Sequence, residues 1–189
     1  MNPIAIFAAT RWELQAVRRA LATDHTATIA GVRCHIGQRG SRSYWLIQTG
    51  VGPVAAAAVA AKVLKAQAMS LVMSTGFACA LVPAQVGDLL IGTSVSSVQA
   101  EGDWTMGANP VLCDETARAG LLVAAQDAGL VARVGTFVSS ETVVCQAEGK
   151  RRLQWLTGAT GLDMESAALA AVAQEQGLPM VIVRTVSDL

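Results

Sequence analysis

The C-terminal stretch, residues 161–189, decides the predicted fold. It reads Gly-Leu-Asp-Met-Glu-Ser-Ala-Ala-Leu-Ala-Ala-Val-Ala-Gln-Glu-Gln-Gly-Leu-Pro-Met-Val-Ile-Val-Arg-Thr-Val-Ser-Asp-Leu. Asp163 is placed to cap a helix whose first turn carries Glu165, and the Gly-Leu-Pro sequence ends that helix. The apolar run 180–183 is rich in β-branched residues, which predicts a buried strand.

This strand is predicted to present Arg184, Ser187 and Asp188 at its C-terminal end. Open α/β sheets bind their ligands at the carboxyl ends of the strands. Glu165 at a helix start and Asp188 at a strand end are therefore expected to face one cleft. From these residues alone, a helix cap and a strand-end turn are the favoured explanation.

Apolar runs alternate with helical patterns along the rest of the chain. This predicts one α/β domain over residues 1–189, with a central mixed β-sheet flanked by helices. Strands are expected at residues 4–9, 26–37, 43–48, 71–76, 87–95 and 131–139, and helices at residues 14–21, 51–64, 114–128 and 148–156. A hairpin turn is expected at 38–42 and loops at 77–81 and 101–110. The charges of the last helix, at Lys150, Arg151 and Arg152, are expected to form a solvated face.

The composition argues against several classes of protein. The formal net charge is zero, so no basic field favours nucleic acid. The most hydrophobic helical pattern, residues 51–64, contains Pro53 and Lys62 and falls short of a membrane span, and the apolar N-terminus lacks the basic region of a signal peptide. Charged residues make up only 15%, which fits either a large core or a surface covered by another subunit. We expect a homo-oligomer, with a dimer as the simplest case.

The cysteines and histidines do not form a reactive cluster. The four cysteines are Cys34, Cys79, Cys113 and Cys145, and they form neither a Cys-x-x-Cys pair nor a Cys/His group. They are expected to be reduced thiols in a cytoplasmic protein that binds no metal there. His25 and His35 lie in peripheral N-terminal segments, which argues against a Ser/His/Asp or Cys/His mechanism.

Two hexads near the C-terminus carry a resemblance to a known family. They are Asp-Met-Glu-Ser-Ala-Ala at 163–168 and Val-Arg-Thr-Val-Ser-Asp at 183–188. Together, about twenty residues apart and in this order, they resemble the signature of the nucleoside phosphorylase and nucleosidase superfamily, most closely its methylthioadenosine/S-adenosylhomocysteine nucleosidase branch. The resemblance implies hydrolysis of the N-glycosidic bond of a purine nucleoside, such as a 5′-substituted adenosine, without a metal or organic cofactor.

The resemblance also implies roles for the residues of the two hexads. Asp188 would protonate N7 of the leaving base, with Ser187 orienting it, and Glu165 would bind the ribose hydroxyls while Met164 packs against the sugar. Physical chemistry adds an expectation for each acid. Burial in a cleft would raise the pKa of Asp188 so that it keeps its proton, whereas a helix N-terminus would favour the ionised form of Glu165.

Glu13 falls where the nucleosidases carry the glutamate that activates water. By the same resemblance Glu13 would deprotonate the attacking water and pair with Arg184. On its own, Glu13 reads as a solvated carboxylate in the first turn of a helix. The Gly-Val-Gly turn at 50–52 similarly reads as a tight structural turn, although in the superfamily this turn lines the substrate cleft.

Two departures from the superfamily pattern bear on the substrate. Thr75 and Gly76 match the family loop, but Phe77 replaces its serine, which favours a hydrolase over a phosphorylase and suggests an apolar substrate tail or an altered ribose pocket. Val143, followed by Val144, occupies the position of the aromatic residue that stacks on the purine. The identity of the base is therefore less firmly indicated than the reaction.

Three alternatives stay open at this point. The first is a phosphate-dependent purine nucleoside phosphorylase, the second an enzyme of the adenosylhopane-processing branch, and the third a nucleoside-binding protein that has lost catalysis. The sequence ends one residue after Asp188, whereas members of the superfamily usually continue through a loop and a C-terminal helix. We expect Asp188 to be a poor acid if no such segment covers it.

Overall fold

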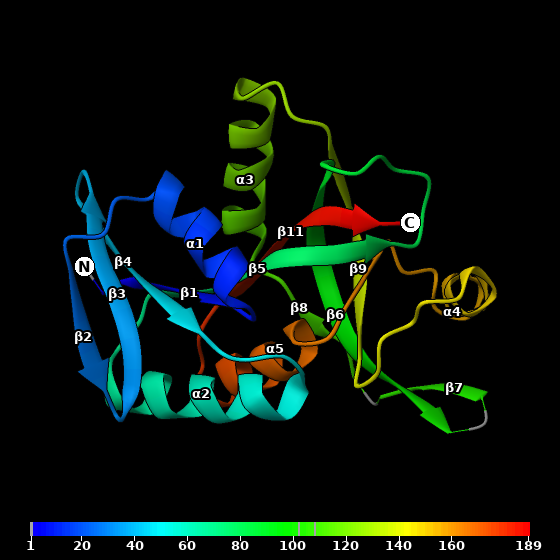
Figure 1. Ribbon diagram of the computed structural model, residues 1–189, viewed down its shortest axis with the longest axis horizontal. Coiled ribbons are helices and arrows are strands. Elements are labelled where there is room, and N and C mark those ends of the chain that lie inside the picture. The colour runs from blue at the N-terminus through cyan, green and yellow to red at the C-terminus, as the bar shows by residue number, and fades with distance from the viewer. Residues whose placement is uncertain (1, 102, 108) are drawn as a thin grey trace.

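The computed structural model describes residues 2–101, 103–107 and 109–189 (Figure 1). In these residues one mixed sheet of 11 strands is flanked by helices, which confirms the predicted fold class. The strands are β1 (Ile4–Ala8), β2 (His25–Ile29), β3 (Val32–Arg39), β4 (Arg42–Gln48), β5 (Leu71–Ala80), β6 (Leu89–Glu101), β7 (Asp103–Met106), β8 (Val111–Leu112), β9 (Ala132–Ser140), β10 (Gly161–Asp163) and β11 (Met180–Asp188). The helices are α1 (Arg11–Ala20), α2 (Pro53–Ala66), α3 (Glu115–Asp127), α4 (Ala147–Thr157) and α5 (Ser166–Glu175).

The sheet runs in the order β10-β9-β6-β11-β5-β1-β4-β3-β2. Strands β4, β1, β5 and β11 are parallel neighbours, whereas β11 and β6 are antiparallel. The short strand β10 pairs with both β9 and β5, so it closes β5, β11, β6, β9 and β10 into a ring. This closure brings the end of β10 beside the carboxyl ends of β5 and β11, where the polar residues of the chain gather.

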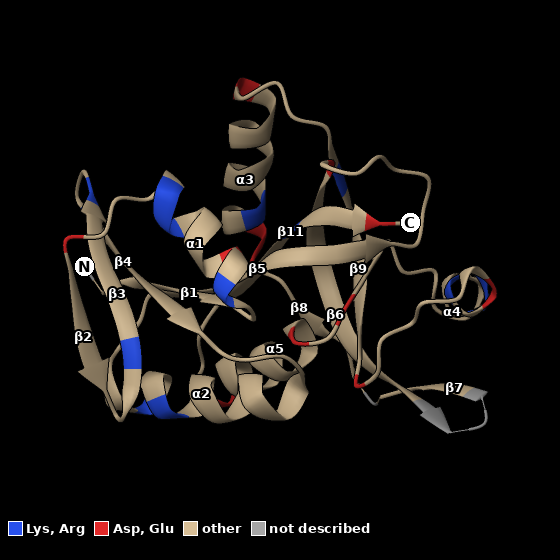
Figure 2. Cartoon of the chain, viewed as in Figure 1, with Lys and Arg blue, Asp and Glu red and all other residues tan. Residues whose placement is uncertain are grey.

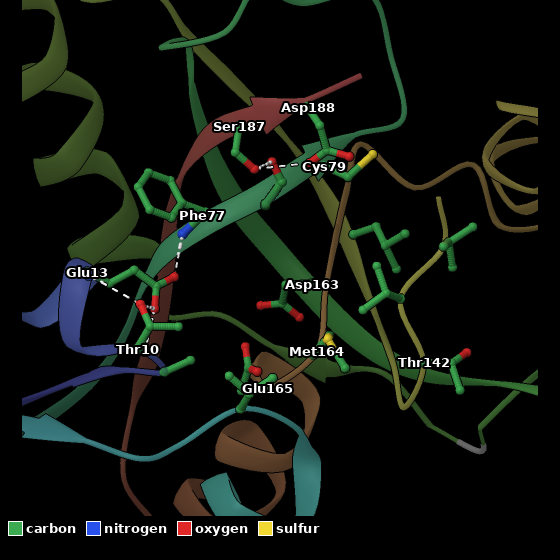
Figure 3. A pocket seen from close by; sticks show the side chains of 16 residues that line it. Thr10, Glu13, Phe77, Cys79, Thr142, Asp163, Met164, Glu165, Ser187 and Asp188 are labelled. Carbon is green, nitrogen blue, oxygen red and sulfur yellow. Dashed lines mark hydrogen bonds between the residues drawn. The ribbon is translucent and has the colours of Figure 1, made fainter. Parts of the chain in front are cut away.

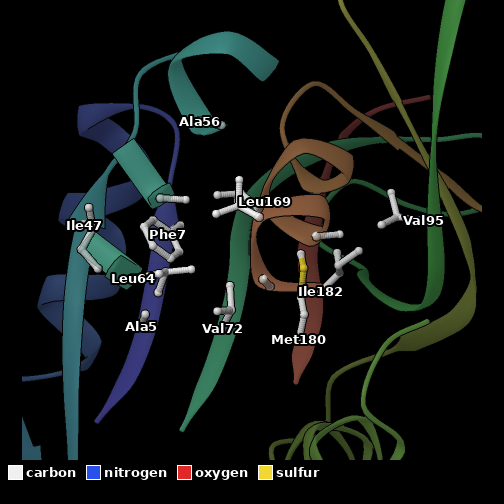
Figure 4. Close-up of a cluster of buried hydrophobic side chains, with 14 of the residues drawn as sticks. Ala5, Phe7, Ile47, Ala56, Leu64, Val72, Val95, Leu169, Met180 and Ile182 are labelled. Carbon is white, nitrogen blue, oxygen red and sulfur yellow. The ribbon is translucent and has the colours of Figure 1, made fainter. Parts of the chain in front are cut away.

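Helices cover the sheet on both sides. Helices α2 and α5 lie next to each other along one side, and α1 and α3 lie on the other (Figure 1). The largest core cluster packs α2 and α5 onto β1, β5 and β11 through side chains such as Phe7, Leu64, Val72, Leu169 and Ile182 (Figure 4). Full burial of a side chain of this size stabilises the fold by about 1.5–3 kcal/mol. Together these contacts hold the three central strands rigidly under the site.

Several local predictions are confirmed. Asp114 caps α3, since its Oδ1 accepts a hydrogen bond of 2.7 Å from the Ala117 amide, and Gly129 follows the helix with a positive φ. Pro53 stands in the first turn of α2, where its missing amide hydrogen costs nothing. A tight turn at Gly40 joins β3 to β4, inside the predicted hairpin turn.

Several predicted boundaries are wrong, among them the end of the strand 87–95, which continues as β6 to Glu101. The predicted strand 26–37 is two strands, β2 and β3, because the chain turns at Ala30 and Gly31 with positive φ at both. The predicted loop 77–81 is mostly strand, since β5 continues to Ala80 between β11 and β10. The predicted loop 101–110 contains β7, and its residues 102 and 108 lie outside the described residues.

The predicted strand 180–183 also ends later than expected, because β11 continues to Asp188. In both β5 and β11 the polar or small residues that suggested a loop pair with a neighbouring strand instead. Backbone hydrogen bonds across the closed ring therefore override the local composition. As a result, Ser187 and Asp188 lie within a strand and their positions are held by it.

Basic and acidic residues occur along the whole chain and are not gathered in one element (Figure 2). Lys and Arg lie on α1, α2 and α4, for example, and acidic residues lie at several turns and strand ends. Each kind numbers 14, which gives the net charge of zero. In the described part of the chain no helix is both long and apolar enough to span a bilayer. One helical charge departs from the predicted solvated face of α4: Lys150 is buried.

Candidate active site

A cavity of about 250 Å³ opens at the carboxyl ends of β1, β5, β10 and β11 (Figure 3). Four acidic side chains from different elements line it: Glu13, Asp163, Glu165 and Asp188. The other lining residues are apolar or small and neutral, and no Lys, Arg or His is among the described residues that line it. Glu165 and Asp188, which the sequence predicted to share a cleft, are both part of this lining.

Glu13 is held rigidly at the start of α1. Its Oε2 accepts hydrogen bonds from the amide of Thr10 at 2.7 Å and from the Thr10 hydroxyl at 2.9 Å, which completes a capping box. Its Oε1 accepts a 2.8 Å bond from the amide of Phe77 on β5. The carboxylate is buried, so the expectation of a solvated first-turn charge is wrong. It is positioned by two elements that are 64 residues apart in sequence.

Glu165 is the residue immediately before α5, not part of its first turn as predicted. Its Oε1 accepts a 2.8 Å hydrogen bond from the amide of Gly52, in the Gly-Val-Gly turn that precedes α2. Burial raises the pKa of Glu165, and the Gly52 bond and the Arg184 charge only partly oppose that effect. The pKa of Glu165 is therefore raised, whereas the helix terminus alone would lower it: burial outweighs the helix terminus.

Asp163 ends β10 and faces the cavity. From the sequence, Asp163 was expected only to cap a helix. Its carboxylate accepts hydrogen bonds from the hydroxyls of Ser139 and Ser166 and, more weakly, from the Ser166 amide at 3.3 Å. Its Oδ2 lies 2.6 Å from Nη2 of Arg184. The capping contact thus exists, but the carboxylate mainly serves a buried ion pair.

Arg184 lies beneath the cavity and does not line it. Its side chain is 1% exposed, and its guanidinium contacts three carboxylates: Asp163 at 2.6 Å, Glu165 at 3.6 Å and Glu13 at 3.9 Å. Nη2 also donates to the hydroxyl of Ser74 at 2.9 Å. The predicted pairing of Glu13 with Arg184 is seen at this longer distance. Both Nη groups of Arg184 are engaged by these partners, Nε has no hydrogen-bond partner among the described residues, and the side chain does not reach the lining of the cavity.

Asp188 stands at the end of β11 with its side chain about half exposed, at 53%. Its Oδ2 lies 2.7 Å from Nζ of Lys150, and its Oδ1 accepts a 3.0 Å bond from the Ser187 hydroxyl. Partial burial raises the pKa of Asp188, but the bonds from Lys150 and Ser187 outweigh it and leave the pKa below its ordinary value. The predicted raised pKa of Asp188 is therefore wrong.

The remaining predicted site residues divide into two groups. Met164, Ser187, Phe77, Val143 and Val144 line the cavity. Thr75 and Gly76 are not in its lining, although both belong to β5 directly before Phe77. Phe77 is about half exposed and Val143 largely exposed, so the two departures from the superfamily pattern stand at the mouth of the cavity.

Gly76 has an indirect role in the geometry. Its φ is +136°, and a Cβ there would lie 2.2 Å from Oε1 of Glu13. Only glycine lets the Glu13 carboxylate approach the β5 backbone this closely. Sequence reasoning missed Asp163, Thr10, Cys79 and Lys150 as parts of this site or its surroundings. The Thr-x-x-Glu spacing at the start of α1 is a local signal that could have indicated the buried capping box.

The described residues contain no group of three His, Cys, Asp or Glu side chains arranged to hold a metal ion. The three buried carboxylates share the Arg184 guanidinium instead. The site therefore combines a buried acidic cluster around one cation with a separate, half-exposed carboxylate across the cavity. This arrangement can position a polar ligand, accept a proton and stabilise positive charge.

Comparison with known proteins identifies the family. A family model described as the phosphorylase superfamily matches residues 3–189. The chain belongs to this superfamily. It is 30% identical over 197 residues to the 5′-methylthioadenosine/S-adenosylhomocysteine nucleosidase of Haemophilus ducreyi, covering 98% of this chain and 84% of the relative. The nucleosidase of the same name from Staphylococcus aureus (strain MRSA252) is 26% identical over 196 residues, covering 98% of this chain and 86% of the relative.

Solved structures of the superfamily share the fold. The 5′-methylthioadenosine/S-adenosylhomocysteine nucleosidase from Neisseria meningitidis, in complex with methylthio-immucillin-A, superposes with a TM-score of 0.89 at 24% identity, covering 100% of this chain and 86% of that one. The native futalosine hydrolase of Helicobacter pylori gives a TM-score of 0.88 at 23% identity, covering 99% and 84% of the two chains. At these identities the likeness concerns the fold.

Proposed function

We propose that the chain hydrolyses the N-glycosidic bond of a purine nucleoside, a 5′-substituted adenosine, and releases the free base. The observation that carries this proposal is the charge of the cavity: four carboxylates line it without a single cation among the described lining residues. Such a lining favours a substrate that develops positive charge on its ribose during bond cleavage. The relatives named as nucleosidases support the same reaction class.

The same observation favours water over phosphate as the acceptor. A phosphate ion would need cationic or amide donors in the cavity, but Arg184 is buried under three carboxylates and the lining is acidic. Placing a dianion beside these carboxylates would cost electrostatic energy that no neighbouring charge offsets. We therefore place the phosphorylase second, and the substitution of Phe77 for a hydroxyl residue supports that order.

In the proposed mechanism, Glu13 removes a proton from a water molecule whose oxygen bonds to C1′ of the ribose. The bond from C1′ to the base nitrogen breaks, and the base leaves with the electron pair. Asp188 gives a proton to N7 of the base, which is the general acid step, and Ser187 orients it. Glu165 binds the ribose hydroxyls and, with Met164 against the sugar, opposes the positive charge that develops on the ring.

The lowered pKa of Asp188 adds a requirement to this mechanism. Because the pKa of Asp188 is lowered, the carboxyl is mostly ionised at neutral pH and must gain a proton before it can act. Its half-exposed position lets it exchange protons with solvent. General acid catalysis by this group should therefore weaken as the pH rises above its pKa.

The experiment that tests the function is incubation with a panel of nucleosides. The panel contains 5′-methylthioadenosine, S-adenosylhomocysteine, futalosine, adenosine and inosine, each with and without phosphate, and free base and sugar products are separated by chromatography. We expect free adenine from a 5′-substituted adenosine without phosphate. Release that requires phosphate would favour the phosphorylase, and tight binding without release would identify a nucleoside-binding protein.

We further propose that the chain works as a homodimer in the cytoplasm. Large apolar side chains are exposed, among them Trp12 at 77% and Val54 at 81%, and a second copy would cover such side chains. The four free cysteines support a reducing compartment. Light scattering after size-exclusion chromatography tests the dimer, since a mass of one chain at micromolar concentration would contradict it.

A further inference from the structure

Lys150 is the one charge of α4 that departs from the predicted solvated face. It is 9% exposed, whereas its neighbour Arg151 is exposed. The aliphatic part of Lys150 follows the buried side of α4, where Leu153 packs into a core cluster with Val138 and Leu162. The helix is thereby anchored, and the ammonium group is carried to the end of β11.

The ammonium group of Lys150 makes two short contacts. Nζ donates to Oδ2 of Asp188 at 2.7 Å and to the backbone carbonyl of Leu189 at 2.7 Å. Lys150 does not line the cavity that holds the acidic cluster; it lines a second cavity together with Leu189, the residue after Asp188. It therefore contacts Asp188 from outside the lining of the acidic cavity.

The two oxygens of Asp188 consequently have different surroundings. Oδ2 is taken by Lys150, and Oδ1 accepts the 3.0 Å bond from Ser187, whose hydroxyl also lies 3.4 Å from the carbonyl of Ala78. Cys79 of β5 is a further titratable group that faces both Asp188 and Lys150. Figure 3 shows it beside Asp188. Three elements, α4, β5 and β11, thus surround one carboxyl group.

We propose that Lys150 is a positioning residue for the reaction. It holds the Asp188 carboxyl group from outside the acidic cavity and sets the pH range in which that group carries a proton. This inference rests on the proposed function, because it assigns Asp188 the general acid step. A fixed ammonium at 2.7 Å favours the ionised carboxylate. It also leaves Oδ1, beside Ser187, as the oxygen that meets the base.

The lowered pKa of Asp188 supports the inference, since the hydrogen bond from Lys150 is the largest of the effects that lower it. The partner responds in the matching direction: burial lowers the pKa of Lys150, but the bond to Asp188 and the neighbouring charges raise it overall. Lys150 therefore keeps its charge through the range in which Asp188 titrates.

The test compares Lys150→Gln, Lys150→Arg and the control Arg151→Gln by their dependence of kcat/KM on pH. This quantity reports the ionisations of the free enzyme. In Lys150→Gln we expect the alkaline limb to move to higher pH, because Asp188 loses the cation that favours its ionised form. The maximal kcat/KM should fall by about 10–100-fold, since the carboxyl is no longer held in place.

Lys150→Arg should keep most of the wild-type dependence of kcat/KM on pH, because a guanidinium can also donate a hydrogen bond to Oδ2. Arg151→Gln removes the same charge from an exposed neighbouring position and should leave the limb unchanged. If the limb stays in place in Lys150→Gln, or moves equally in Arg151→Gln, the inference is wrong. Circular dichroism of each variant separates a loss of fold from a loss of positioning.

A readout that needs no activity keeps this inference distinct from the proposed function. The carboxyl carbon of Asp188 can be titrated by carbon-13 NMR in the wild type and in Lys150→Gln, with Asp188→Asn to assign the signal. We expect a higher midpoint in Lys150→Gln. An unchanged midpoint contradicts the inference even if the enzyme is active, whereas a moved midpoint in a chain that releases no base contradicts only the proposed function.

Discussion

Glu165 is a buried carboxylate whose ionised form is unfavourable in the folded chain. Burial raises its pKa, and Asp163 and Glu13 act in the same direction. Between the unfolded and the folded pKa the native state binds more protons, so stability falls as the pH rises through that window and stays lower above it. The ionised form of Glu165 is therefore held in the site at a cost in stability above that window.

Replacing Glu165 by Gln should thus stabilise the chain at pH 7 while impairing turnover. Gln keeps an oxygen that can accept the Gly52 bond, but it removes the buried charge. A gain of about 1 kcal/mol corresponds to a rise in Tm of about 2–4 °C for a chain of this size. Thermal unfolding at pH 7 and pH 5 measures this, and the difference should shrink at the lower pH.

Asp163→Asn is the matched control for Glu165→Gln. Asp163 lies 2.6 Å from Arg184 and accepts two hydroxyl bonds, so the loss of its charge leaves the buried guanidinium short of a partner. This variant should lower Tm. A lower Tm for Glu165→Gln as well, at pH 7, would show that the carboxylate of Glu165 is a net stabilising ion and would contradict the account given for it.

Asp188 should behave in the opposite way. Its folded pKa is lowered, so its contribution to stability is present above the unfolded pKa and is lost as the pH falls through the folded one. Because the side chain is about half exposed, solvent screens this contribution. Asp188→Asn should therefore leave Tm nearly unchanged and reduce turnover by about 10²–10⁴. Wild-type rates of base release in this variant would remove Asp188 from the mechanism.

At the scale of elements, the approach of α1 to β5 fixes the position of Glu13. Gly76→Ala should displace that carboxylate, because the new Cβ would lie 2.2 Å from its Oε1 and the φ of +136° is strained for alanine. A displacement of this kind can lower kcat/KM by about 10²-fold. Steady-state kinetics with 5′-methylthioadenosine measures it, and folding is checked by circular dichroism.

Gly31→Ala provides the control, since Gly31 also has a positive φ, of +79°, but nothing lies within 4 Å of a Cβ there. It should lose stability through backbone strain of the order of 1–3 kcal/mol without losing activity at a temperature where it is folded. Equal activity in the two variants would mean that contact between β5 and Glu13 is not needed.

For single helices and strands, the sequence predicts those features that a local pattern of residues determines. The β-branched run before Arg184, the Asp114 cap and the Pro at the start of α2 each specify one element through nearby residues. The loop predicted after Gly76 is wrong because β10 pairs with β5 from more than 80 residues away, and that partner cannot be read from the composition of β5. The division of residues 26–37 into β2 and β3 depends on a two-residue turn that the apolar pattern conceals.

At the scale of the whole molecule, Arg184 joins three parts of the fold. It contacts carboxylates from α1, from β10 and from the start of α5. Arg184→Met should destabilise the chain by about 3–5 kcal/mol, because it leaves buried carboxylates without their cation. Chemical denaturation measures this. Arg133→Met removes the half-exposed partner of Asp88 and should cost below about 1 kcal/mol; equal losses would contradict a central role for Arg184.

The site was predicted only in part, because its contacts join residues that are far apart in the sequence. Two hexads indicate that Glu165 and Asp188 share a cavity, and both line it. The direction of the pKa shift was predicted wrongly for both acids. For Asp188 it depends on Lys150, and for Glu165 it depends on burial beside Asp163. Those contacts join residues from separate elements, and helix position or strand position alone does not determine them.

The central claim is that this acidic cavity uses water to cleave a nucleoside. The most direct test is the reaction of 5′-methylthioadenosine in water enriched in oxygen-18, with phosphate also present, followed by mass spectrometry of the sugar product. We expect free adenine and a sugar that carries the heavy oxygen at C1. A sugar phosphate formed in place of the labelled sugar, or no release of adenine, would contradict it.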